Sequence, residues 1–202
     1  MRTWLGSIFC LTGGLLLSVA GGRYTLGELR ADQARRTWNE TVAHQAVAEA
    51  RLAALPRGRE PVVAGAPMAR LVIPKIGLDE VVLQGVAGDE LDALPGHVPG
   101  SAVPGERGNA VISAHRDRHF RHLDEVNLGD TLITESLGRH DAWVVVAKRV
   151  IDKNAPALFQ TPDPTLTLTT CWPIRYFGAA PDRLIITAKR LTSVDRWERQ
   201  SD

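Results

Sequence analysis

Short runs of β-forming residues, separated by turns, dominate the chain from residue 69 onward. The runs are rich in Val, Ile and Thr, and residues such as Gly, Pro and Asp separate them, as in strands joined by short connections. We expect strands at 69–74, 80–84, 109–114, 130–135, 142–151, 165–171 and 183–190. Helical stretches are expected at 88–93 and at about 119–126. This pattern predicts a mainly β fold, either a sandwich or a closed barrel.

A helical pattern precedes the strands. Residues 24–55 contain no proline, and apolar side chains recur in them at helical spacing. This spacing predicts an amphipathic helix that packs on the β domain or separates it from a membrane. The apolar positions are Leu26, Leu29, Trp38, Val42, Ala46 and Ala50. Residues 56–67 are rich in Pro and Gly and are expected to form a linker.

The first residues indicate where the chain resides. Residues 3–22 carry no charge and follow Arg2, and a run of about 20 predominantly apolar residues is long enough to span a bilayer. We expect an uncleaved, single-pass anchor in the inner or plasma membrane, with the amino terminus inside and the remainder extracytoplasmic. A cleaved signal peptide, with a small-residue site near Ala20, is the alternative, and it also implies export.

Four segments follow from these patterns: an anchor at 1–23, a helical spacer and linker at 24–67, a β domain at 68–192 and a C-terminal tail at 193–202. The formal net charge of the whole chain is +1. A chain so close to neutrality has no basic surplus for a nucleic-acid partner, and none is expected.

A single cysteine, Cys171, ends the strand expected at 165–171. The chain's other cysteine, Cys10, lies in the apolar run, so the two cannot form an intramolecular disulfide. An unpaired cysteine is unusual in an exported domain, because oxidising compartments favour pairing. Cys171 is therefore either a reactive thiol or a small buried apolar residue.

A cysteine nucleophile needs a base to generate its thiolate, and histidine is the usual partner. His115 follows the strand expected at 109–114, so it occupies a position like that of Cys171. Arg183 begins the next strand after Cys171, where a guanidinium can stabilise a developing oxyanion. If these strands are neighbours, the three side chains meet at one rim. Taken alone, Arg183 is better explained as a surface charge at the end of a strand.

Other kinds of site find less support. His115, His119 and His122 have a spacing compatible with metal ligands, but the segment lacks H-E-x-x-H, and we predict no metal and no cofactor. A serine nucleophile would need the pattern G-x-S-x-G, which is missing. Asp152 and Asp163 are too few to indicate a calcium site.

Several segments resemble, in the expected order, the motifs of the sortases, a family of cysteine transpeptidases on bacterial surfaces. "TLTTC" (167–171) matches the pattern T-L-x-T-C, "VISAHRD" (111–117) resembles the histidine segment, and "RLIITAKR" (183–190) resembles the arginine strand. Two further segments, 71–85 and 94–117, resemble the first strand pair and the run that leads to the histidine. "HRDRHF" and "TCWP" look most similar to class D and Gram-negative-type members. Leu94, Ala114 and Trp172 depart from the usual residues.

The resemblance implies an eight-stranded sortase-like β-barrel and a reaction. Cys171 would be the nucleophile, His115 the general acid and base, and Arg183 the group that stabilises the oxyanion or substrate. The substrate would be an LPxTG-like sorting signal of a dedicated surface protein, and the acceptor an amine of the cell envelope or of another protein.

Weaker expectations concern the neighbouring residues. Thr169, Thr170, Trp172 and Tyr176 are candidate substrate contacts, and His97 is expected to support the structure. Two rival functions stay open: an exported cysteine peptidase that uses water as acceptor, and a non-catalytic β-barrel binding module.

Overall fold

The computed structural model describes residues 22, 25–42, 63–136, 139–155 and 160–191. The expected anchor at 3–22, apart from residue 22, most of the linker at 56–67 and the tail at 193–202 lie outside these residues. In the described part of the chain, no helix combines the length and the hydropathy needed to cross a bilayer.

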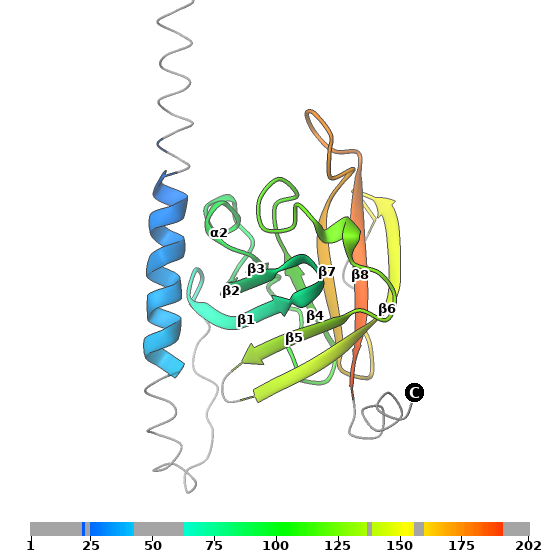
Figure 1. Ribbon diagram of the computed structural model, residues 1–202, viewed down its shortest axis with the longest axis horizontal. Coiled ribbons are helices and arrows are strands. Elements are labelled where there is room, and N and C mark those ends of the chain that lie inside the picture. The colour runs from blue at the N-terminus through cyan, green and yellow to red at the C-terminus, as the bar shows by residue number, and fades with distance from the viewer. Residues whose placement is uncertain (1–21, 23–24, 43–62, 137–138, 156–159, 192–202) are drawn as a thin grey trace, which may run out of the picture.

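The described residues form a closed barrel of eight strands in the order β1-β2-β3-β4-β7-β8-β6-β5 (Figure 1). The strands are β1 (Pro67–Ile73), β2 (Leu78–Gln84), β3 (Gly96–His97), β4 (Asn109–Ser113), β5 (Thr131–Ser136), β6 (Arg139–Asp152), β7 (Thr165–Trp172) and β8 (Asp182–Arg190). The smaller elements are the helix over residues 25–42, α2 (Gly88–Ala93) and two 3-10 turns, η1 (Pro74–Ile76) and η2 (Leu123–Glu125).

The predicted β-barrel is confirmed, with two differences in its elements. β3 is only two residues long and lies in a Gly- and Pro-rich segment, so it shows no strand periodicity. The helix expected at about 119–126 is only the 3-10 turn η2. Here Val126 returns to extended backbone, which ends the turn after Glu125.

Most neighbouring strands are antiparallel, but β2 pairs with β3 and β4 pairs with β7 in parallel. The barrel closes through three pairs between β1 and β5, which begin at Arg70 and Glu135. Alternate apolar side chains fill the interior, among them Leu71, Ile112, Trp143, Leu166 and Leu168. Because β4 and β7 run in the same direction, their C-terminal ends lie at one end of the barrel, where β8 begins.

The 25–42 helix lies along the side of the barrel and starts at that same end (Figure 1). Its buried face is formed by Gly27, Ala31, Ala34 and Trp38, which recur at helical spacing. These residues pack on β2 and α2 through an apolar cluster: Ala31, Ala34, Trp38, Val81, Leu83, Ala93 and Leu94.

The predicted helix therefore packs on the barrel through Trp38, as expected, but most of its contact face differs from the predicted one. Leu26, Leu29 and Val42 are exposed, although their apolar character predicted burial. Glycine and alanine form the rest of the contact beside Trp38, because small side chains let the helix backbone approach the barrel closely. Arg35 reinforces the contact through an ion pair with Glu80, with 2.9 Å between Nη2 and Oε2.

Candidate active site

The structure brings the three predicted catalytic residues to neighbouring strand ends. Cys171 on β7 pairs directly with Arg183 on β8, and directly opposed residues of an antiparallel pair lie on the same face of the sheet. In the parallel pair, Ser113 of β4 is opposite Thr169 of β7. His115 and Cys171 each lie two residues after this pair, so the two residues occur at corresponding positions in the neighbouring segments. The expectation that these strands are neighbours is confirmed.

Hydrogen bonds hold the backbone before His115 against β7. The Ala114 amide donates to the Thr169 carbonyl at 3.3 Å, and the Thr170 hydroxyl donates to the Ala114 carbonyl at 2.8 Å. Thr170 is 1% exposed, so water does not compete with this bond. The residue before the imidazole is thereby fixed to the residue before the thiol.

His115 has an acidic neighbour that the sequence did not indicate. Its Nε2 lies 3.4 Å from Oδ1 of Asp92, which comes from α2. Both side chains are about one third exposed, at 38% and 30%. A carboxylate oxygen at this position can accept a hydrogen bond from the ring nitrogen and so restrain the orientation of the ring. The only available signal was an acidic residue shortly before "LPGH", and acidic residues are common in such helices.

Arg183 keeps most of its guanidinium uncommitted. Its Nε donates to the Lys153 carbonyl at 3.5 Å, which is long for a hydrogen bond. Among the described residues, no carboxylate forms an ion pair with it. A half-buried, unneutralised guanidinium opposite Cys171 can donate hydrogen bonds to an anion or a polarised carbonyl.

The three histidines at 115, 119 and 122 have separate partners and do not converge on a common point. His119 lies between the Ala93 carbonyl, 2.9 Å from Nε2, and Glu80, whose Oε1 is 3.3 Å from Nδ1. His122 pairs with Glu125 at 2.8 Å. In the described part of the chain, no group of three metal-ligating side chains comes together.

Glu80 connects the 25–42 helix to the segment that follows His115. Burial alone would raise the pKa of Glu80, but hydrogen bonds from His119 and Arg35 outweigh this effect, and its pKa lies below the ordinary value. Glu80 therefore stays ionised and holds both partners.

His97 occupies a structural position. It is 3% exposed, and its ring nitrogens bond to Gln84, Ser101 and the Ala102 carbonyl. Burial lowers the pKa of His97, although the Ala102 carbonyl opposes this effect. A buried ring enclosed by hydrogen bonds positions the chain around it, and it lies on β3 away from the end of β7.

The candidate substrate contacts differ in exposure. Thr169 and Thr170 are buried, and the Thr169 hydroxyl has no hydrogen-bond partner among the described residues. Trp172 is half-buried and packs on the barrel core. Tyr176 is about half exposed on the β7–β8 loop. Their contact with substrate stays a prediction.

Arg116, the residue after His115, was not singled out from the sequence, yet it organises this loop. Its guanidinium donates to the Pro173 carbonyl at 3.1 Å and to the Gly178 carbonyl at 2.6 Å. It also lies 5.6 Å from the centre of the Tyr176 ring. The loop after Cys171 is thus fixed to the segment that carries His115.

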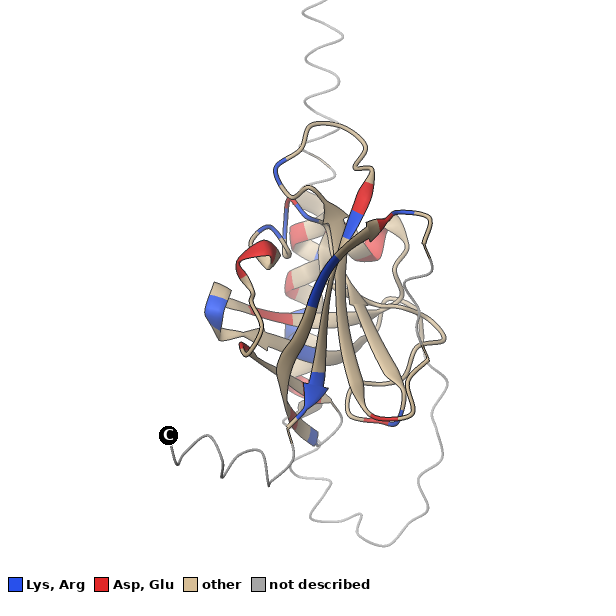
Figure 2. Ribbon diagram, turned by 90° about the vertical axis from the view of Figure 1, so that its right-hand side faces the viewer, with Lys and Arg blue, Asp and Glu red and all other residues tan. Residues whose placement is uncertain are grey.

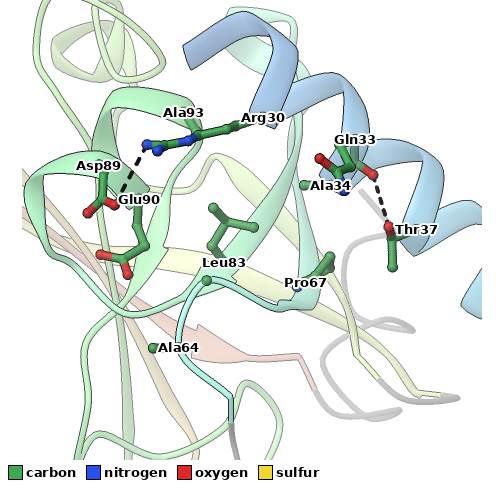
Figure 3. A pocket seen from close by; sticks show the side chains of 11 residues that line it. Arg30, Gln33, Ala34, Thr37, Ala64, Pro67, Leu83, Asp89, Glu90 and Ala93 are labelled. Atoms are coloured by element: carbon green, nitrogen blue, oxygen red, sulfur yellow. Dashed lines mark hydrogen bonds and ion pairs between the residues drawn. The ribbon is translucent and has the colours of Figure 1, made fainter. Parts of the chain in front are cut away.

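A separate cavity of about 410 Å³ lies between the 25–42 helix, the strands β1 and β2, and α2 (Figure 3). It is lined by Arg30, Gln33, Ala34, Thr37, Ala64, Gly65, Pro67, Leu83, Asp89, Glu90 and Ala93. The lining contains no thiol or imidazole and no residue of β4, β7 or β8. We therefore place the chemistry at the strand ends and not in this cavity.

Comparison with known proteins agrees with this arrangement. A family model described as Sortase domain matches residues 71–191. Sortase D of Bacillus subtilis (strain 168) is 38% identical over 125 residues, which cover 60% of this chain and 63% of that protein. The chain thus spans a little under two thirds of the length of this relative.

Solved structures give the same result for the fold. A Sortase D5 transpeptidase of Clostridium perfringens superposes with a TM-score of 0.64 at 23% identity, over 83% of this chain and 99% of that one. The catalytic domain of B. anthracis SrtD gives a TM-score of 0.56 at 28% identity, over 68% and 95%.

These relatives support the predicted likeness to class D sortases, whereas none of them supports the narrower likeness to Gram-negative-type enzymes. The family match covers more than half of the chain, and the motifs that carry the resemblance lie on the barrel strands described above. The chain belongs to the sortase family.

Proposed function

We propose that this chain is a membrane-anchored, extracytoplasmic cysteine transpeptidase that cleaves an LPxTG-like sorting signal and transfers the acyl group to an amine. The observation that carries the proposal is the juxtaposition of Cys171, Arg183 and His115 at the ends of β7, β8 and β4. The likeness to Sortase D of B. subtilis and to the Sortase D5 transpeptidase of C. perfringens supports the same chemistry.

In the first half of the reaction, the Cys171 thiolate attacks the carbonyl carbon of the Thr–Gly bond. The carbonyl oxygen becomes an oxyanion, to which the Arg183 guanidinium donates hydrogen bonds. The C–N bond then breaks, and protonated His115 gives its proton to the departing glycine nitrogen. The products are a thioester on Cys171, a free amine and a neutral imidazole.

In the second half, the acceptor amine attacks the thioester carbon and loses a proton to His115. The C–S bond breaks, an amide forms, and the thiolate and imidazolium are restored. Asp92, 3.4 Å from Nε2 of His115, restrains the orientation of the imidazole, which gives up a proton in the first half-reaction and accepts one in the second. Atoms and charges balance with no further reagent.

Mass spectrometry on the full-length protein in detergent tests the proposal. The protein is incubated with an LPxTG-type peptide, with and without a small amine, and Cys171→Ala serves as the control. We expect an acyl adduct on Cys171 and an amine-ligated product, both lost in the control. A panel of peptides that vary each position of the motif guards against a negative result caused by a peptide that the enzyme does not recognise.

The rival functions give different results in the same assay. Cleavage that yields only the acid, whatever amine is supplied, would favour a peptidase that uses water. A thiol that reacts neither with the peptides nor with iodoacetamide in the folded protein would favour a non-catalytic binding module. Ligation to the amine excludes both.

A further inference from the structure

The β7–β8 loop, residues 173–181, holds an aromatic pair in solvent at the catalytic end of the barrel. Phe177 is fully exposed (102%), and Tyr176 is 49% exposed. Single exposed apolar residues are ordinary on protein surfaces, but a completely exposed phenylalanine next to a tyrosine costs hydration free energy that a partner would recover.

The exposure is built into the loop. Arg116 holds the loop at Pro173 and Gly178, on either side of the aromatic pair. Ile174 is buried and packs against the barrel core. Gly178 has a φ of 91°, a backbone conformation that turns the chain at little cost only for glycine. The loop therefore presents Phe177 outward from a fixed base.

A second apolar group lies at the same end of the molecule. Leu26 and Leu29, in the first two turns of the 25–42 helix, are 56% and 65% exposed. Figure 1 shows that the helix begins at the end where the β7–β8 loop protrudes, and that the tip of this loop extends beyond the start of the helix. Figure 2 shows the loop largely free of charged residues.

The sequence places the proposed membrane close to these residues. The uncharged run ends at residue 22, and the helix is described from residue 25. Three residues span at most about 11 Å when fully extended. If residues 3–22 cross the bilayer, the first turns of the helix lie at the membrane surface, and so does the loop that extends beyond them.

We propose that Tyr176 and Phe177 insert into the membrane interface and, with Leu26 and Leu29, form a second membrane contact that orients the barrel with its active site toward the lipid surface. Aromatic residues favour the interfacial region of a bilayer, and apolar groups that bind there reach about 5–10 Å into it. Arg175, exposed beside the pair, suits anionic headgroups. This inference rests on the membrane anchoring in the proposed function.

Fluorescence quenching in vesicles tests the inference with the full chain. The protein is reconstituted into vesicles of phosphatidylcholine and phosphatidylglycerol, with one environment-sensitive label on one cysteine. The first protein carries Phe177→Cys with Cys10→Ser and Cys171→Ser. The matched control carries Asp163→Cys in the same background, because Asp163 is exposed in the loop before β7, at the opposite end of that strand. The third keeps Cys10 and carries only Cys171→Ser.

We expect nitroxide groups on the lipid chains to quench the labels at positions 177 and 10, and aqueous iodide to quench the label at 163. If the label at 10 responds to the lipid quencher while that at 177 responds like the one at 163, the anchor stands and the second contact is refuted. If the labels at 10 and 177 both respond only to iodide, the anchoring and the inference fail together. The inference would also be refuted if an added sorting peptide, and not the lipid, protected the label at position 177 from iodide. The transpeptidase assay in detergent is independent of all these outcomes.

Discussion

At the scale of single residues, the site depends on a register that brings a cation opposite a nucleophile. Because Cys171 and Arg183 are directly paired, their side chains share one face, and a shift of one residue in β8 would move the guanidinium to the other face. The uncommitted state of Arg183 suggests that substrate, and not a protein carboxylate, completes its hydrogen bonds.

Replacing Arg183 tests this role. We expect Arg183→Gln to lower kcat about 100- to 1000-fold, the cost of removing an oxyanion donor, and Arg183→Lys to retain part of the activity because it keeps the charge but loses the planar fork. The measurement is steady-state ligation of the sorting peptide. Arg149→Gln, at an exposed arginine of β6, is the control, and an Arg183→Gln enzyme as fast as this control would rule out the role.

We expect Asp92, which lies 3.4 Å from Nε2 of His115, to act by positioning that ring. We expect Asp92→Asn, which keeps the shape but removes the charge beside His115, to lower kcat by up to about 100-fold, the lower range for acid–base assistance, while KM and the melting temperature stay unchanged. Asp89→Asn, at an exposed neighbour on the same helix, should have no effect on kcat. Equal losses in the two variants, or a rise in KM alone, would contradict the assignment.

The sequence was sufficient to place Cys171, His115 and Arg183 together, since each stands at the end of a recognisable strand, and their catalytic roles stay a prediction. It was not sufficient for Asp92 or Arg116. Asp92 meets His115 only because Arg118 and His119, shortly after His115, bond to the backbone of α2. Arg116 acquires its role only once the β7–β8 loop folds over it. Contacts of this kind depend on tertiary packing, which local periodicity does not encode.

At the scale of elements, the 25–42 helix is coupled to the site through α2. An added Cβ on Gly27 would lie 2.7 Å from the backbone oxygen of Asp92, and Arg118 bonds to that same oxygen and to Glu28 of the helix. The sequence predicted the helix, but of the large apolar residues expected at its contact face only Trp38 is buried, whereas Leu26, Leu29 and Val42 are exposed. Close backbone approach reversed this, because glycine and alanine leave room where leucine does not.

Two glycine substitutions separate helix propensity from packing. We expect Gly27→Ala to lower the stability by about 1–3 kcal/mol, the usual cost of overpacking. Gly22 is also helical. Gly22→Ala should be neutral or stabilising by up to about 1 kcal/mol, the difference in helix propensity, because an added Cβ there meets nothing within 4 Å. Thermal unfolding of the two variants in detergent measures the difference. Equal melting temperatures would show that the helix does not pack tightly against α2.

At the scale of the whole molecule, acid should loosen the barrel through His97 as well as through its carboxylates. The folded-state pKa of His97 lies below its ordinary value of 6.5 because burial disfavours the charged ring. The unfolded chain therefore binds more protons in this range. The stability that this group contributes is complete above about pH 6.5 and is lost as the pH falls through the folded-state value.

Comparison with His97→Gln, which has no titratable group at this position, isolates the contribution of His97 to the pH dependence of stability. We expect the unfolding free energy of the wild type to fall relative to that of His97→Gln below pH 6.5, with a slope of at most about 1.4 kcal/mol per pH unit, the limit for one proton. Denaturant unfolding at a series of pH values measures it. A constant difference between pH 7 and pH 5 would mean that the ring is not held neutral in the fold.

Closure of the sheet through β1 and β5 has a consequence for aggregation. An open sheet exposes unpaired amide and carbonyl groups on its outermost strands, and such strands template aggregation with other chains. A barrel whose last strand returns to its first has satisfied those groups internally. Closure in this way leaves neither β1 nor β5 as an open edge to which an extended polypeptide could add as a further strand.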